Sequence, residues 1–87
     1  MIAGLGNPGK SYIFTRHNLG FRVVDCLSLK WGIGIKRRKF HSLLGEGGWS
    51  ARKVILIKPQ TMMNESGKAI RQAFAFYRMN IADLLVI

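Results

Sequence analysis

Acidic residues are scarce in this sequence. Four Asp and Glu stand against fourteen Lys and Arg, which gives 87 residues a formal net charge of +10. This imbalance favours a polyanionic partner, and nucleic acid is the first candidate. A solvated basic surface without a partner is the alternative. Membrane binding is disfavoured, because we find no basic amphipathic helix in the sequence.

Cysteine and long apolar runs are also nearly missing. The single cysteine, Cys26, cannot close an internal disulfide, which indicates a reducing compartment. Because it lies in an expected helix between Val24 and Leu27, we expect a small buried hydrophobe and not a nucleophile. No apolar run approaches membrane-spanning length, and no secretory signal pattern is present. These absences predict a cytoplasmic protein.

The pattern of apolar residues predicts alternating strands and helices. A short apolar strand ends near Leu5, and an amphipathic helix begins at about Thr15 and ends at Gly32. The helix has an apolar stripe of Phe21, Val24, Leu27 and Trp31. At 87 residues the chain is one domain at most.

The second half of the sequence predicts a hairpin, a helix and a final strand. Residues 40–44 form one strand, Gly47 and Gly48 supply the turn, and the next strand ends at Pro59. A second helix begins at Thr61 or Asn64, either of which could be its cap, and runs to Tyr77 with a stripe of Ile70, Ala73, Phe74 and Tyr77. Residues 84–87 read as a buried central strand. The expected fold is α/β, a mixed β-sheet with helices packed on it, truncated after a central strand.

A glycine pattern near the N-terminus raises the question of a dinucleotide site. Gly4, Gly6 and Gly9 satisfy G-x-G-x-x-G, which in a nucleotide-binding loop opens directly into a helix. Here Pro8 removes an N–H donor, and the helical pattern begins several residues later. The acid at a suitable distance, Asp25, falls in mid-helix. We therefore disfavour dinucleotide binding.

Polar residues with chemical capability follow the first strand. Asn7 has an amide that both donates and accepts, and His17 stands near the start of the first helix. The helix dipole disfavours the charged imidazolium there, which leaves an imidazole able to accept a proton at neutral pH. His17 is thus a candidate general base. A capping or packing histidine is the alternative.

Three motifs together resemble the bacterial-type peptidyl-tRNA hydrolases: GLGNPGKSY, TRHNLGF and TMMNESGKAI, in this order. The resemblance runs from residue 2 to residue 87. It implies a monomeric α/β protein without metal or cofactor. It also implies hydrolysis of the ester bond between peptide and tRNA, with tRNA as the larger half of the substrate and no membrane partner.

The resemblance also assigns roles to individual residues. His17 is similar to the base that activates water, and Asn7 to an amide that binds substrate near the ester. Asn64 resembles the asparagine that positions water or the peptide backbone, and Met63 an apolar contact beside it. Tyr12 matches an aromatic residue of the family loop.

The remaining assignments are weaker. Asn18 follows the histidine as it does in the family and is a second-tier candidate. Asn64 could act only as a helix cap, and Met63 could be core filler. His41 is expected to be structural or exposed. The cation run of residues 36–39 is expected to contact tRNA phosphates.

Residues 1–87 resemble the N-terminal portion of a single hydrolase domain whose C-terminal half is absent. The resemblance implies that an aspartate beyond residue 87 orients the catalytic histidine, so we expect the 87-residue chain to be impaired. The alternative function is a non-catalytic RNA-binding protein of the same fold.

Overall fold

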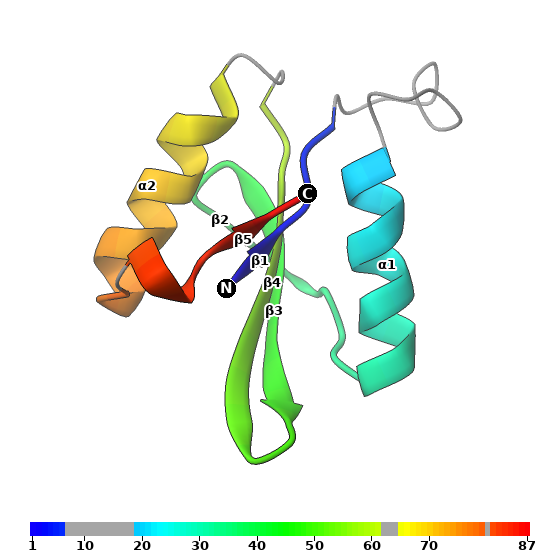
Figure 1. The fold of residues 1–87 in the computed structure, drawn as a ribbon. Helices are drawn as coiled ribbons and strands as arrows, with labels where there is room; N and C mark the ends of the chain where they lie inside the picture. Colours follow the sequence, from blue (N-terminus) through cyan, green and yellow to red (C-terminus); the bar gives the residue numbers. More distant parts are fainter. Residues whose placement is uncertain (7–18, 62–64, 80) are drawn as a thin grey trace.

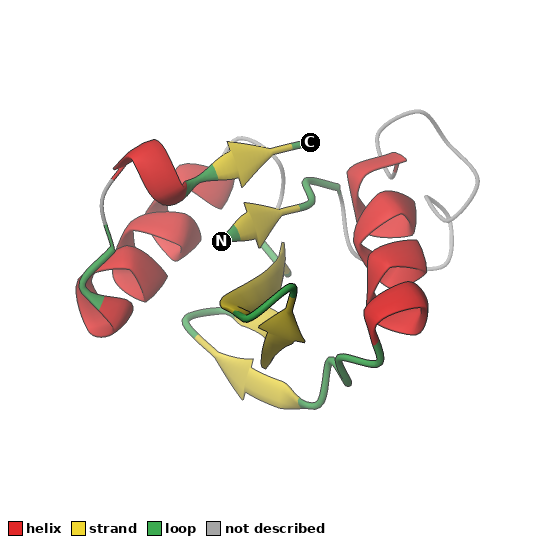
Figure 2. Ribbon diagram, turned by 60° about the horizontal axis from the view of Figure 1, so that its bottom comes forward, coloured by secondary structure: helices red, strands yellow, loops and turns green. Residues whose placement is uncertain are grey.

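The computed structural model describes residues 1–6, 19–61, 65–79 and 81–87. A five-stranded sheet of order β2-β3-β4-β1-β5 lies between two helices, with α1 on one face and α2 on the other (Figures 1 and 2). The elements are β1 (Ile2–Ala3), α1 (Leu19–Trp31), β2 (Arg37–Lys39), β3 (Ser42–Trp49), β4 (Arg52–Pro59), α2 (Ser66–Tyr77), the 3₁₀ helix η4 (Ile81–Asp83) and β5 (Leu85–Val86). Strand β1 is parallel to β4 and β5, whereas β3 is antiparallel to both of its neighbours, β2 and β4. The predicted α/β fold with a mixed sheet is confirmed, with β2 as an additional short strand.

The core is built around β4, which is buried on both faces. Ile55 and Ile57 pack with Leu44 and Ala73 on the α2 side of the sheet. Leu56, which alternates with them along the strand, packs with Val24 on the α1 side. A continuous β-branched and apolar run is typical of a strand covered on both sides.

Helix α1 follows the predicted apolar stripe. Phe21 and Val24 are buried, and Gly32 ends the helix with a φ of 66°. Cys26, however, is exposed, so its predicted burial is wrong. It lies two residues after Val24, about 200° around the helix axis, and this places it on the solvent side.

Both hairpins have tight turns without glycine. Phe40–His41 joins β2 to β3, and Ser50–Ala51 joins β3 to β4, with all four residues at φ between 52° and 63°. Two consecutive positive φ values are typical of type I′ turns, which match the twist of the flanking strands. The predicted turn at residues 47–48 is wrong, since both glycines lie within β3. A Cβ on Gly47 would lie 2.5 Å from the Ile33 side chain. The glycine therefore allows Ile33, in the segment after α1, to pack directly against β3.

Helix α2 confirms the predicted apolar stripe. Ala73 is fully buried, and Phe74 and Tyr77 pack partly buried against the core. Burial is the main cause that raises the pKa of Tyr77 to about 12, so its hydroxyl is neutral at physiological pH. The N-cap position is Glu65. Thr61 is therefore not the cap, and residue 64 lies outside the described residues.

Strand β5 lies at the edge of the sheet and not at its centre. It pairs with β1, and no described strand pairs with its other side. The side chains of Leu85 and Val86 remain 56% and 45% exposed. The predicted burial of this strand is not found within residues 1–87, because only one side of β5 has a described neighbour.

The first turn of α1 contacts the end of β1 backbone to backbone. A Cβ on Gly20 would lie 2.4 Å from both the Leu5 nitrogen and the Ile87 oxygen, and a Cβ on Gly4 would lie 2.3 Å from the Gly20 oxygen. Any side chain at these two glycines would push the helix away from the sheet.

We expect Gly20→Ala to lower the free energy of unfolding by about 1–3 kcal/mol, because the added methyl group overpacks against rigid backbone. Gly67→Ala in α2 is the matched control, since a Cβ there has no described neighbour within 4 Å. Its expected effect is neutral or a gain of up to about 1 kcal/mol from helix propensity. Urea unfolding of both variants measures the difference. Equal stability of Gly20→Ala and the unmodified chain would contradict the close approach.

Candidate active site

The carboxyl ends of three parallel strands meet at one edge of the sheet. Beyond β1, the Gly4 nitrogen donates to the Ile57 oxygen at 3.0 Å and the Leu5 nitrogen to the Ile87 oxygen at 2.9 Å. The pairing therefore continues to the end of all three strands. We call this region, comprising residues 4–6, 59–61 and 87, the carboxyl edge. In α/β sheets ligands bind outside this end of the strands.

Two segments carry all the predicted site residues, and both are attached at the carboxyl edge. Residues 7–18 leave from Gly6 and re-enter at Leu19, at the start of α1, which rests on the end of β1. Residues 62–64 follow Thr61 and precede Glu65.

The predicted site residues themselves lie outside the described residues: Asn7, Tyr12, His17, Asn18, Met63 and Asn64. Their roles therefore stay predictions. The structure locates the four points where the chain enters and leaves their segments.

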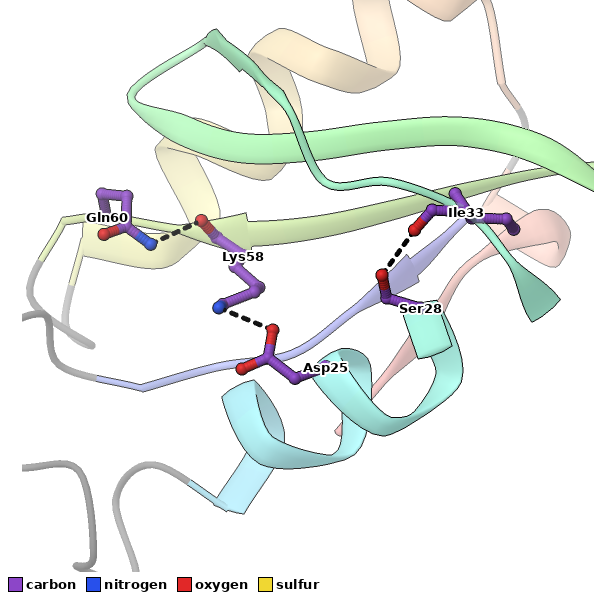
Figure 3. Close-up of polar contacts among 5 residues, drawn as sticks. All are labelled: Asp25, Ser28, Ile33, Lys58 and Gln60. Carbon is purple, nitrogen blue, oxygen red and sulfur yellow. Dashed lines mark hydrogen bonds and ion pairs between the residues drawn. The ribbon is translucent and has the colours of Figure 1, made fainter. Parts of the chain in front are cut away.

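An ion pair ties α1 to β4 close to this edge. The Lys58 ammonium donates to Oδ1 of Asp25 at 2.8 Å (Figure 3). The backbone carbonyl of Lys58 accepts from the side-chain amide of Gln60 at 3.1 Å. The ammonium also lies 5.4 Å from the ring centroid of Phe21. Lys58 is 15% exposed and Asp25 is 53% exposed, so the lysine depends more on the contact. The pair aligns the helix that follows residue 18 with the strand that precedes residue 62.

Two adjoining cavities open beside the end of β4. One has a volume of about 430 Å³ and is lined by the β2–β3 turn and by Gln60 and Thr61. The other, about 190 Å³, lies between the same turn and the first turns of α2. His41 and Thr61 line both cavities. The Gln60 nitrogen donates to the His41 oxygen at 2.8 Å, which fixes the turn against the strand end.

Two hydroxyl groups at this place are buried without a described partner. Oγ1 of Thr61 and Oγ of Ser66 have no hydrogen-bond partner among the described residues. They stand on either side of residues 62–64. The sequence predicted Thr61 only as a possible cap and His41 only as structural or exposed. Their place beside the cavities was not predicted. No local pattern signals it, because a strand end, a turn and a helix from three parts of the chain form the cavities.

Among residues 1–6, 19–61, 65–79 and 81–87, no three His, Cys, Asp or Glu side chains gather closely enough to hold a metal ion. Within the same ranges, neither helix is long and apolar enough to cross a membrane. The fold defines an α/β protein, a class in which ligands commonly bind at the carboxyl ends of the strands.

Comparison with known proteins names the family. The family described as peptidyl-tRNA hydrolase matches residues 1–87, and the chain belongs to this family. It is 55% identical over 87 residues to the peptidyl-tRNA hydrolase of Caldanaerobacter subterraneus subsp. tengcongensis, covering 100% of the chain and 47% of that relative. It is also 55% identical over 87 residues to that of Carboxydothermus hydrogenoformans, covering 100% of the chain and 46% of the relative.

A solved structure agrees with the sequence relatives. The crystal structure of peptidyl-tRNA hydrolase from Acinetobacter baumannii superposes with a TM-score of 0.93 at 42% identity, over 98% of this chain and 44% of that one. The fold is therefore shared over almost all of the chain. The chain spans about half the length of the relatives it matches.

We expect the Asp25–Lys58 pair to contribute measurably to stability. A double-mutant cycle with Asp25→Asn and Lys58→Met should give a coupling free energy of about 0.5–1 kcal/mol, since one partner is mostly exposed. Thermal or urea unfolding of the four proteins supplies it. Strict additivity of the two single substitutions would show that the pair does not tie α1 to β4.

Proposed function

We propose that the protein hydrolyses the ester bond between peptide and tRNA in peptidyl-tRNA, which releases free tRNA for translation. The observation that carries this proposal is the family match over residues 1–87, supported by relatives named peptidyl-tRNA hydrolase at 55% identity. The three motif segments also border the carboxyl edge, where α/β proteins bind ligands.

The chemistry assigned to these residues needs only neutral polar groups and one base. The imidazole of His17 removes a proton from water as the water oxygen bonds to the ester carbonyl carbon. When the ester bond breaks, the same proton passes to the ribose oxygen that leaves. The amides of Asn7 and Asn64 hold the peptide and the water and stabilise the developing oxyanion. Met63 and Tyr12 line the peptide side, and Asn18 adjoins the base.

The charge of the chain fits an RNA substrate. A net charge of +10 attracts the phosphate backbone, and the cation run includes the exposed edge strand β2. We propose that the protein acts as a monomer in the cytoplasm, where peptidyl-tRNA is produced. No metal and no cofactor take part in the proposed reaction.

In a protein that joins residues 1–87 to the C-terminal half found in the relatives, His17→Ala should reduce single-turnover hydrolysis of peptidyl-tRNA by at least about a hundredfold. Binding of tRNA should stay nearly intact, because general-base catalysis contributes about 10²–10⁴. Asn7→Ala and Asn64→Ala should weaken both binding and rate. The melting temperature of each variant, measured beside the rate, separates catalysis from folding. Cys26→Ser, an exposed change on α1, is the control with an expected unchanged rate.

Two outcomes would contradict the proposal. Unchanged hydrolysis by well-folded His17→Ala protein would end the assignment of the base. Tight tRNA binding without any hydrolysis, by the unsubstituted protein that includes the C-terminal half found in the relatives, would instead favour a non-catalytic RNA-binding protein.

A further inference from the structure

The two cavities beside the end of β4 share His41 and Thr61 in their linings, so they lie side by side. We call the pair of cavities the turn–helix groove. Cations border it on both sides. Arg38 and Lys39 come from β2, and Lys68 comes from α2. The one carboxylate in the lining is Glu65. The groove therefore carries a positive excess inside an already basic chain.

The cations reach the groove from different faces of the sheet. Arg38 pairs with Leu43, whose partner in β4 is Lys58, so this row faces α1. Lys39 alternates to the other face, where its ammonium lies 4.5 Å from the ring centroid of Phe76 on α2. Arg38 and Lys39 are both exposed. A ligand in the groove would thus meet positive charge from both sides of the turn.

A polar group in the groove also lacks a partner. Oγ1 of Thr61 is buried, borders both cavities and has no hydrogen-bond partner among the described residues. A buried hydroxyl is costly to leave unpaired, and this one has capacity for a hydrogen bond that no described residue uses. A hydroxyl next to lysine and arginine side chains is a typical phosphate contact.

The groove extends from the exposed strand β2 to the carboxyl edge. Thr61 immediately precedes residues 62–64, which carry two of the predicted substrate contacts, and it belongs to the carboxyl edge. The groove therefore leads from the exposed strand β2 toward the candidate active site. The two cavities have volumes of about 430 and 190 Å³, which is the size range of sites for small ligands. We therefore expect them to hold a short unpaired segment and not a duplex.

We propose that the turn–helix groove binds the phosphodiester backbone of a single-stranded RNA end and guides this end to the carboxyl edge. Arg38, Lys39 and Lys68 pair with phosphate oxygens, and the Thr61 hydroxyl donates to one of them. The identity of the RNA as the 3′ end of tRNA rests on the proposed function. The groove itself is argued from charge, shape and the unpaired hydroxyl.

The test compares matched lysine and arginine variants. Lys68→Ala and Arg38→Ala remove a positive charge from the groove, whereas Lys30→Ala removes one from the last turn of α1, outside the groove lining. The probe is a single-stranded RNA oligonucleotide ending in CCA, with a duplex of equal charge and inorganic phosphate as comparisons. Binding is measured at several salt concentrations, and KM and kcat are measured with peptidyl-tRNA.

Each groove variant should weaken binding of the single strand about three- to tenfold and lower the salt slope by about 0.7 for each lost phosphate contact. KM should rise with kcat unchanged, because the groove contacts substrate away from the reacting ester. Lys30→Ala should have a smaller effect on both. Thr61→Val, which removes only the hydroxyl, should weaken binding without changing the salt slope.

Several results would overturn the proposal. Equal losses in Lys68→Ala and Lys30→Ala would show a general charge effect, and equal losses for duplex and single strand would contradict the guiding role. Competition by inorganic phosphate as strong as that by the oligonucleotide would indicate a simple anion site. Absence of hydrolysis by the unsubstituted protein that includes the C-terminal half found in the relatives, together with groove-dependent RNA binding, would contradict the proposed function and leave the groove proposal standing.

Discussion

The structure depends on the backbone contact between the first turn of α1 and the end of β1. Gly20 has no space for a side chain because the Leu5 nitrogen and the Ile87 oxygen both occupy that place. The contact fixes the start of α1 on the carboxyl edge of three parallel strands. Since residues 7–18 run between Gly6 and Leu19, both ends of the segment that carries the predicted base are fixed by one contact.

The buried strand β4 supplies the second fixed point. The buried side chains of Ile55, Leu56 and Ile57 fix β4 in the core on both faces. Near the end of the strand, Lys58 contacts α1 through its ion pair with Asp25. These contacts fix the position of the end of β4, and Thr61 follows it at the same edge of the sheet. In α/β proteins, functional residues are commonly carried by loops that rigid strands and helices position.

Sequence patterns predicted the helices and strands better than the turns and the contacts between distant parts of the chain. The stripes on α1 and α2 and the apolar run of β4 follow from helical and strand periodicity, which are local properties. The turn at Ser50–Ala51 escaped prediction because non-glycine residues adopt positive φ there, while the neighbouring Gly47 serves contact with Ile33.

Features that depend on other parts of the chain were harder to predict. The exposure of the β5 side chains depends on how many strands pair with it, and the cavity at His41 and Thr61 joins three distant elements. The roles of His17, Asn7 and Asn64 came from the resemblance of whole motifs, since one histidine or asparagine by itself also fits a cap.

The central claim is that substrate binds at the carboxyl edge of β1, β4 and β5. Amide chemical-shift mapping with an adenosine that carries a peptide through a non-hydrolysable 3′ amide tests it most directly. We expect the largest shifts at the amides of Leu5, Gly6 and Thr61, with little change at Trp49 at the far end of the hairpin. Shifts concentrated around Trp49, with the carboxyl edge unaffected, would contradict it.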